Sequence, residues 1–357
     1  MSRVRGRRAV VGWVEIAALV GLSPGPARAM QTSPPPRGAV VFATARDGIA
    51  QIYVINADGT GLRRLSPGGG ADTHPVFSPD GRHIAFSEQQ RAADVIHYVQ
   101  SIWVMNADGS GARRLTSGAQ ADIEPVWSPD GQRLAYTRVA HNGHAAVWLM
   151  NADGSHQRQL RTSAPDAVDY RPTFSPDGRH VAFTSVSYDR TGENADIWLI
   201  DTDGTHLRRL TDSGDYDTDA VFSPNGRQIA FATGRAGNGD IWTMDVDGTY
   251  QRQLTTDPAW DTTPAYSPDG TRIAFASNRR GGNGDLWVMN TDGTGQTCLT
   301  TDAAADTDPS WTGAPDALEH GGTVSANSLA TLPPPVGCLE PDPAATLNQL
   351  APTGPEG

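Results

Sequence analysis

The sequence predicts an all-β fold, a six-bladed β-propeller built from four-stranded antiparallel blades. Three observations lead to this prediction. A nine-residue unit that ends in Asp-Gly occurs six times, with its last glycines 50, 45, 50, 44 and 45 residues apart. An apolar triplet, such as Ile-Ala-Phe at 273–275, precedes each unit. A short polar segment that ends in leucine follows each unit.

The nine-residue units are expected to form the strands on which the blades are centred. They occupy residues 51–59, 101–109, 146–154, 196–204, 240–248 and 285–293. In the fourth unit Ile197 and Leu199 alternate with Trp198 and Ile200, so both faces of this strand are apolar. A strand with two apolar faces lies between two layers of structure rather than on a surface.

Two turns in each repeat define the other strands. The pattern D-x-x-P-x-(W/F)-S-P-D-G, as at 122–131, ends in one turn, and the nine-residue unit ends in the other. Asp-Gly after a strand favours a hairpin, because glycine adopts a positive φ without a Cβ clash. Two such turns give four antiparallel strands. Because a single sheet of this kind cannot bury both faces alone, we expect the six sheets to stack radially.

The ends of the repeat array predict how the ring closes. The first repeat begins at its triplet, 40–42, without a D-x-x-P strand, and the last repeat is followed by a spare one at 306–312. We expect this late strand to pair with the first repeat, because closure removes the exposed edge of an open array. The propeller is therefore predicted to span residues 39–312.

The two ends of the chain have a different composition. Residues 1–29 are predicted to be a signal peptide, with a basic head, an apolar stretch at 9–22 that is too short to span a bilayer, and the cleavage site Ala27-Arg28-Ala29. An uncleaved anchor and a misassigned start are the alternatives. Residues 30–38 are expected to be a linker. Residues 313–357, rich in Ala, Pro and Gly, are expected to be a low-complexity, disordered tail.

Charge excludes some classes of partner. The chain contains 28 basic residues, all arginine, against 40 acidic ones, for a net charge of −12. Beyond Ala29 the balance is 23 basic to 39 acidic residues, a net charge of −16. An acidic surface argues against nucleic acid and anionic membranes as partners. We expect an exported monomer without a stable membrane span, located in the periplasm or cell envelope or secreted.

The whole pattern, (I/V)-A-F…D-I-W-V-M-N-A-D-G…R-R-L-T…D-x-x-P-x-W-S-P-D-G, resembles the TolB-type propeller repeat, a relative of the WD repeat, over residues 40–312. The resemblance implies a periplasmic or secreted binding scaffold. It also implies a TolB-like propeller without the α/β domain of TolB, since residues 30–38 alone separate the predicted signal from the first strand. Prolyl-oligopeptidase-like enzymes carry the same repeat, but residues 39–312 contain no G-x-S-x-G elbow.

Two sets of six residues are candidate site residues at the mouth of the central channel. The aspartates that begin the D-x-x-P strands are Asp72, Asp122, Asp169, Asp217, Asp261 and Asp306. They could bind Ca²⁺ or another cation, or each could hold its strand by accepting a backbone hydrogen bond. The residues two positions later differ between blades, which makes them candidates for ligand specificity: His74, Glu124, Arg171, Asp219, Thr263 and Asp308.

The connections that vary in length, 87–100, 137–145 and 185–195, are predicted to lie on the same face as these residues. Variable loops on a rigid scaffold commonly carry binding sites. His97, Tyr98 and Trp260 are candidate partner contacts in this region. The two cysteines, Cys298 and Cys338, could form a disulfide in an oxidising compartment, or remain two thiols.

These observations predict an exported, non-catalytic propeller scaffold that binds a protein or glycan partner through its variable-loop face. No cofactor is expected, although Ca²⁺ at the channel is the one ion that the aspartates would suit. The alternative is a propeller enzyme of the lyase or lactone-hydrolase type that depends on a metal in the channel. The catalytic residues and any metal ligands of such an enzyme are not identifiable from the sequence.

Overall fold

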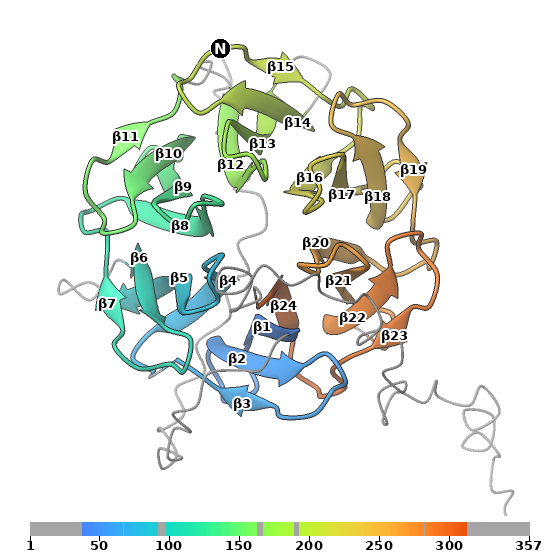
Figure 1. Ribbon diagram of the computed structural model, residues 1–357, viewed down its shortest axis with the longest axis horizontal. Helices are drawn as coiled ribbons and strands as arrows, with labels where there is room; N and C mark the ends of the chain where they lie inside the picture. Colours follow the sequence, from blue (N-terminus) through green and yellow to red (C-terminus); the bar gives the residue numbers. More distant parts are fainter. Residues whose placement is uncertain are drawn as a thin grey trace, which may run out of the picture.

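The protein forms a ring of six antiparallel sheets (Figure 1). A computed structural model describes residues 38–66, 68–91, 98–162, 167–188, 193–281 and 283–312. This part of the chain contains 24 strands and no helix, and therefore no helix that could cross a membrane. The six-bladed, all-β prediction is confirmed. The expected signal peptide and tail lie outside the described residues, as does the expected linker except for Gly38.

In each blade the strands are named here from the innermost to the outermost. Blade 1 contains β24 (Asp306–Trp311), β1 (Ala39–Thr44), β2 (Gln51–Asn56) and β3 (Arg63–Arg64). Blade 2 contains β4 (Ala71–Phe77), β5 (His83–Arg91), β6 (Tyr98–Asn106) and β7 (Arg113–Arg114). Blade 3 contains β8 (Ala121–Trp127), β9 (Arg133–Val139), β10 (Ala145–Asn151) and β11 (Arg158–Gln159).

The second half of the ring repeats this arrangement. Blade 4 contains β12 (Ala167–Phe174), β13 (His180–Tyr188), β14 (Glu193–Asp201) and β15 (Arg208–Arg209). Blade 5 contains β16 (Asp217–Phe222), β17 (Gln228–Thr233), β18 (Asp240–Asp245) and β19 (Arg252–Gln253). Blade 6 contains β20 (Asp261–Tyr266), β21 (Arg272–Ser277), β22 (Asp285–Asn290) and β23 (Thr297–Cys298).

The ring closes where the sequence predicts. Strand β24 pairs antiparallel with β1, so that Trp311 lies opposite Val40 and Asp306 lies opposite Thr44. The backbone N–H of Thr312 donates to the carbonyl of Ala39 at 2.8 Å. Blade 1 therefore joins three strands from the start of the described chain to one from its end.

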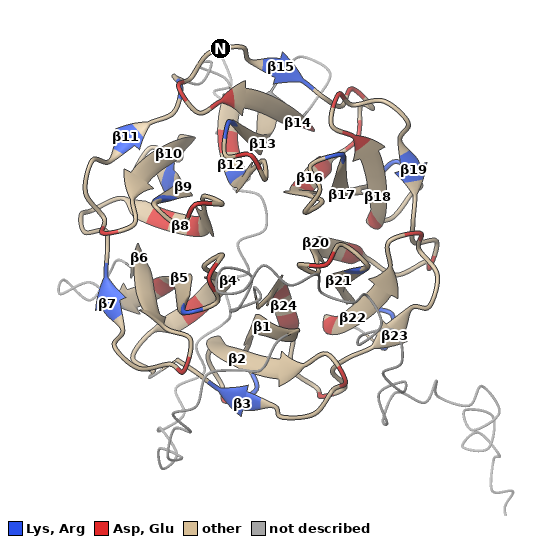
Figure 2. Ribbon diagram, viewed as in Figure 1, with Lys and Arg blue, Asp and Glu red and all other residues tan. Residues whose placement is uncertain are grey.

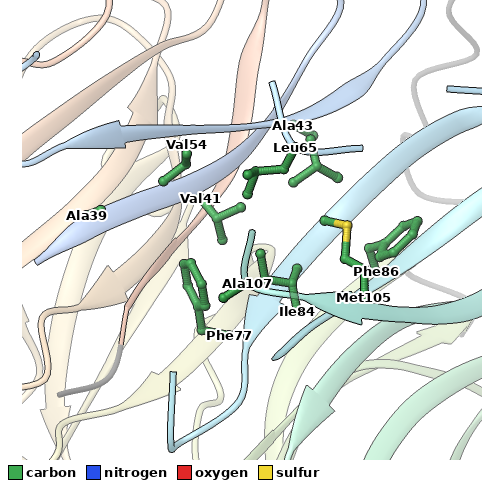
Figure 3. Close-up of a cluster of buried hydrophobic side chains, with 11 residues drawn as sticks. Ala39, Val41, Ala43, Val54, Leu65, Phe77, Ile84, Phe86, Met105 and Ala107 are labelled. Atoms are coloured by element: carbon green, nitrogen blue, oxygen red, sulfur yellow. The ribbon is translucent and has the colours of Figure 1, made fainter. Parts of the chain in front are cut away.

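The hydrophobic core is divided among the six interfaces between neighbouring blades. At the interface of blades 1 and 2, Val41 and Val54 face Phe77, Ile84 and other residues of the next sheet (Figure 3). Five further clusters of buried side chains fill the other interfaces in the same way. The middle strands are apolar on both faces because each face packs against a different neighbour.

Glycines in the outer turns bring adjacent blades into close contact. A Cβ on Gly248 (φ +92°) would lie 2.5 Å from the carbonyl oxygen of Leu210 in the preceding blade. By contrast, a Cβ on Gly226 (φ +69°) would meet nothing nearer than a Pro176 carbon at 3.7 Å. The two glycines share a positive φ, but only Gly248 also lacks room for a side chain.

We therefore predict that Gly248→Ala destabilises the protein more than Gly226→Ala does. The left-handed backbone alone should cost about 1–2 kcal/mol in both variants, and the backbone clash should add at least about 1 kcal/mol to Gly248→Ala. Chemical denaturation of both variants and the parent protein measures the difference. Equal losses would mean that the blades can separate at this turn without a penalty.

Candidate functional site

The strands of each blade run alternately between two faces of the ring. One face carries tight turns such as 78–81 and 107–110. In the first of these turns the N–H of Gly81 donates to the carbonyl of Ser78 at 2.8 Å. We call it the turn face. The opposite face carries the starts of the innermost strands and the connections between the second and third strands, such as 140–144. We call it the loop face, and the candidate site residues lie toward it.

Each innermost strand contains a β-bulge in the same place. The pairing register between the innermost strand and its neighbour shifts in all six blades. The shift includes one residue with a φ between 50° and 57°, which is a strained conformation for a side chain other than glycine. These six residues are His74, Glu124, Arg171, Asp219, Thr263 and Asp308. They are the same six that the sequence marks as candidates for ligand specificity.

Five of these side chains, from five different blades, interact around the ring. Arg171 forms ion pairs with Asp219 of the next blade and with Glu124 of the preceding blade, the latter at 3.5 Å. His74 Nε2 lies 3.9 Å from a carboxylate oxygen of Asp308. The innermost strands carry both acidic and basic residues around the central space (Figure 2). The bulge residues thus form a charged cluster that spans several blades.

Electrostatics keeps Arg171 charged. Burial on its own would lower the pKa of its guanidinium, but the carboxylates of Asp219, Glu124 and Asp308 raise the pKa above its usual value. The backbone N–H of Arg171 also donates to Glu124 Oε2 at 2.9 Å. One arginine therefore holds carboxylates from several blades, and the cluster carries a net negative charge while His74 is neutral.

The aspartates that begin the innermost strands lie inside the blades. All six are between 0% and 3% exposed. In five blades an arginine reaches the carboxylate at 2.6 to 3.0 Å, in the pairs Asp306–Arg46, Asp122–Arg138, Asp169–Arg161, Asp217–Arg235 and Asp261–Arg279. A buried carboxylate that has a guanidinium partner avoids the cost of an unpaired buried charge.

The same arginines stack on aromatic rings of their blades. The guanidinium carbon of Arg138 lies 4.4 Å from the ring centroid of Trp148, and that of Arg279 lies 4.4 Å from the centroid of Trp287. Arg46, Arg161 and Arg235 have equivalent aromatic partners at 4.9 to 5.2 Å. This repeated Asp–Arg–aromatic unit links the innermost strand to the rest of its blade.

Blade 2 departs from this unit. Asp72 lies opposite Glu88 in the pairing of β4 with β5, where blade 3 places Asp122 opposite Arg138. Burial, with a smaller contribution from the Glu88 charge, raises the pKa of Asp72 to about 7. Burial also raises the pKa of Glu88. Two acidic groups thus meet where blade 3 holds a carboxylate and a guanidinium.

The loop face also contains a small polar cavity in blade 3, of about 350 Å³. It is lined by the Asp122–Arg138 pair, His141, Gln157 and the connection 117–120. Arg138 donates to Gln157 at 2.9 Å as well as to Asp122, so its hydrogen-bonding groups are largely engaged within the blade. Among the described residues, no three His, Cys, Asp or Glu side chains are grouped closely enough to hold a metal ion.

Two large aromatic residues are exposed at equivalent positions in neighbouring blades. Trp260 and Tyr216 directly precede the aspartates of blades 6 and 5, and they are 60% and 47% exposed. One edge of the Trp260 ring approaches Gly239, where an added Cβ would come within 2.9 Å of it. Trp260 therefore packs on blade 5 and still presents most of its surface to solvent.

The structure covers the remaining candidates in part. Tyr98 begins strand β6, and His97 lies outside the described residues. Cys298 is 1% exposed in β23, with its sulfur 2.8 Å from the carbonyl oxygen of Thr300. Cys338 lies outside the described residues, so the disulfide stays a prediction.

Comparison with known proteins agrees with this geometry. Residues 219–319, which include most of blade 5, blade 6 and β24, match the family described as the TolB beta propeller domain. This stretch of the six-bladed ring therefore matches a TolB-type propeller domain. The resemblance predicted from the repeats is confirmed.

Solved structures with the same fold include TolB proteins and a peptidase. TolB from Acinetobacter baumannii is 22% identical with a TM-score of 0.64, over 78% of this chain and 67% of that chain. A putative TolB from Agrobacterium tumefaciens is 22% identical with a TM-score of 0.59, over 73% of this chain and 88% of that chain. A puromycin-hydrolyzing peptidase from Mycobacterium tuberculosis is 17% identical with a TM-score of 0.52, over 70% of this chain and 41% of that chain. Identities at this level show a common fold and nothing about activity.

The five arginines that pair with the aspartates were not among the residues selected from the sequence. A signal for four of them is present, because Arg46, Arg138, Arg235 and Arg279 each follow the apolar triplet of their blade by two to four residues. Arg161 comes from the connection between blades 3 and 4 instead, so no repeat pattern marks it.

We predict that Arg279→Ala lowers the free energy of unfolding by about 3–5 kcal/mol, because it leaves the Asp261 carboxylate buried without its guanidinium partner. Arg280→Ala is the matched control. Arg280 is the next residue and is exposed, and surface substitutions usually change stability by less than about 0.5 kcal/mol. Urea denaturation of both variants measures the difference. Similar small effects would show that the buried pair contributes little to the blade.

Proposed function

We propose that the protein is an exported, non-catalytic scaffold that binds a protein or glycan partner through the loop face of its propeller. The observation that carries the proposal is the pair of exposed aromatic residues, Trp260 and Tyr216, at equivalent positions in adjacent blades. Tryptophan and tyrosine dominate the binding energy of many interfaces, because a large apolar ring with a polar edge suits a surface that is alternately wet and covered.

The stiffness of the scaffold supports this proposal. Trp260 is held by two backbone contacts with Asn278, one from its own N–H to the Asn278 side chain at 2.8 Å and one to its carbonyl at 3.2 Å. A partner that docks on a fixed ring loses less conformational entropy than one that must order a loop. Binding surfaces are frequently built in this way, on connections held by a rigid framework.

The charged cluster of the bulge residues supports the non-catalytic part of the proposal. Its charged side chains are engaged with one another, as in the contacts of Arg171 with Glu124 and Asp219. Groups held in such ion pairs serve to recognise a complementary surface more readily than to transfer protons. Export is proposed from the signal-like residues 1–29 and from the TolB-type repeat.

The proposal is tested with the double variant Trp260→Ala, Tyr216→Ala. Immobilised protein is incubated with cell-envelope protein extract and, separately, with a glycan array. We expect the bound species to lose affinity by about 30-fold or more, since one central aromatic contact commonly contributes about 2 kcal/mol or more.

The matched control is Tyr250→Ala. Tyr250 is 84% exposed and follows the tight turn between β18 and β19, on the turn face. This variant should retain the partner in full. A species that binds the double variant as well as the parent, or that is lost with Tyr250→Ala, would contradict the proposal.

The enzyme alternative predicts a different result from the same purified protein. A channel-metal-dependent lyase or lactone hydrolase would retain about one equivalent of metal, with Ca²⁺ the ion that carboxylate oxygens favour. Elemental analysis therefore separates the two hypotheses. Stoichiometric Ca²⁺ that is lost in Asp219→Asn would favour the enzyme over the scaffold.

A further inference from the structure

In the described part of blade 2, a group is missing that the other five blades contain. In those five blades a guanidinium reaches the buried aspartate of the innermost strand at 2.6 to 3.0 Å. In blade 2 the equivalent Asp72 lies opposite Glu88, and among the described residues no arginine forms an ion pair with either carboxylate. The other five blades therefore show that a guanidinium is the group that pairs with the aspartate at this position.

The two carboxylates are buried, and their hydrogen bonding is incomplete. Asp72 is 2% exposed, and its Oδ1 atom has no hydrogen-bond partner among the described residues. Glu88 is 8% exposed, with Oε2 accepting one bond from the side chain of Gln90 at 3.0 Å. An unsatisfied buried carboxylate oxygen beside a second acid is unfavourable unless one acid is protonated or a cation occupies the site.

Two described arginines whose charges act on these carboxylates are held elsewhere. Arg64 bonds to the side chain of Gln51, and its Nε donates to the carbonyl of Ser66 at 3.0 Å. Arg114 donates to the side chain of Ser101 and to the carbonyl of Thr116, both at 2.6 Å. The charges of these two guanidinium groups offset part of the rise that burial causes in the pKa values of the carboxyls, but neither group forms an ion pair with them.

The connection that enters blade 2 passes close to this pair without side chains. Residues 68–70 are Gly-Gly-Gly, where blade 3 has Gly-Ala-Gln at 118–120. A Cβ on Gly70 would lie 2.3 Å from the carbonyl oxygen of Gln89, and a Cβ on Gly69 would lie 3.6 Å from Glu88 Oε1. Gly69 and Gly70 of this connection therefore bring backbone rather than side chains close to Glu88.

We propose that Asp72 and Glu88 form a receptor on the loop face for an arginine side chain of a protein partner. This inference rests on the proposed scaffold function, and it selects a protein rather than a glycan as the partner. A guanidinium has a planar set of donors that matches carboxylate oxygens, as it does in the other five blades.

A divalent cation fits this site less well than a guanidinium does. Ca²⁺ takes six to eight oxygen ligands, and blade 2 brings two carboxylates together. The described residues contain no cluster of three or more acidic, His or Cys side chains at this position. Ca²⁺ is therefore the competing outcome of the test, not the proposed ligand.

Binding should strengthen as the pH rises. A guanidinium pairs with ionised carboxylates, and burial raises the pKa of Asp72 to about 7 and raises that of Glu88 as well. Asp72 therefore becomes available for pairing as the pH rises through about 7, whereas the guanidinium of an arginine ligand keeps its charge. Binding of the cation at neutral pH should release protons from the site.

The test uses the full chain and N-acetyl-L-arginine amide as the probe, with N-acetyl-L-citrulline amide as the uncharged control of the same shape. We expect saturable binding of the arginine compound in the millimolar range, no binding of the citrulline compound, and at least a tenfold loss in Glu88→Gln. Asp212→Asn is the matched control, since Asp212 is an exposed acid (82%) on the connection that enters blade 5. Calorimetry or NMR titration at pH 6 and pH 8 measures the binding of both compounds to the parent protein and to both variants.

A second variant adds a readout of stability to the measurement of probe binding. Glu88→Arg installs the arrangement that blade 3 has in Asp122–Arg138, so it should raise the melting temperature and abolish probe binding. Equal binding of both compounds, binding unchanged in Glu88→Gln, or tighter binding of Ca²⁺ than of the arginine probe would overturn the proposal. If the probe binds but no partner is recovered through the loop face, the receptor stands and the scaffold function fails.

Discussion

Every sheet of this protein is apolar on both faces, and the rest of the structure depends on covering all twelve of those faces. A ring meets this requirement, because each sheet then packs between two others and no terminal sheet is left uncovered. The six hydrophobic clusters at the blade interfaces are the result. Strand β24 completes the ring, since it gives blade 1 the innermost strand that the start of the array lacks.

A second set of stabilising contacts lies inside the blades, in the buried Asp–Arg–aromatic units. The aspartate belongs to the innermost strand and the aromatic residue to one of the two middle strands, so the guanidinium between them ties neighbouring strands together. These units lie near the loop face, where the connections differ in length. They fix the strand starts, which leaves the connecting loops free to vary without disturbing the ring.

Much of the fold followed from local sequence patterns. The nine-residue unit has apolar residues on both faces, the Asp-Gly turns define the hairpins, and the spare segment 306–312 predicts the closure. These features are local or periodic, which is why one sequence reveals them. The choice of residues two positions after each aspartate also came from the sequence, because those positions break the symmetry of the repeat.

The contacts of the candidate site did not follow in the same way. Ion pairs such as Asp306–Arg46 join residues 260 positions apart, and Arg161 reaches Asp169 from a connection that has no counterpart among the other arginines. The positive φ at the bulge was equally hidden, because the proline that follows five of the six residues marks an irregularity but not its geometry. The carboxyl pair of blade 2 becomes visible only once Glu88 is aligned with Arg138 through the strand register.

The central claim is that the sheets support one another only as a closed ring. It is tested most directly by comparing the thermal unfolding of two truncated chains, one ending at residue 312 and one at residue 305. The account predicts a single cooperative transition for the first. It predicts a loss of cooperative unfolding, with exposed apolar surface that binds a hydrophobic dye, for the second, and recovery when a peptide of residues 303–314 is added. A chain ending at residue 305 that melts as sharply and at the same temperature as the longer one would contradict it.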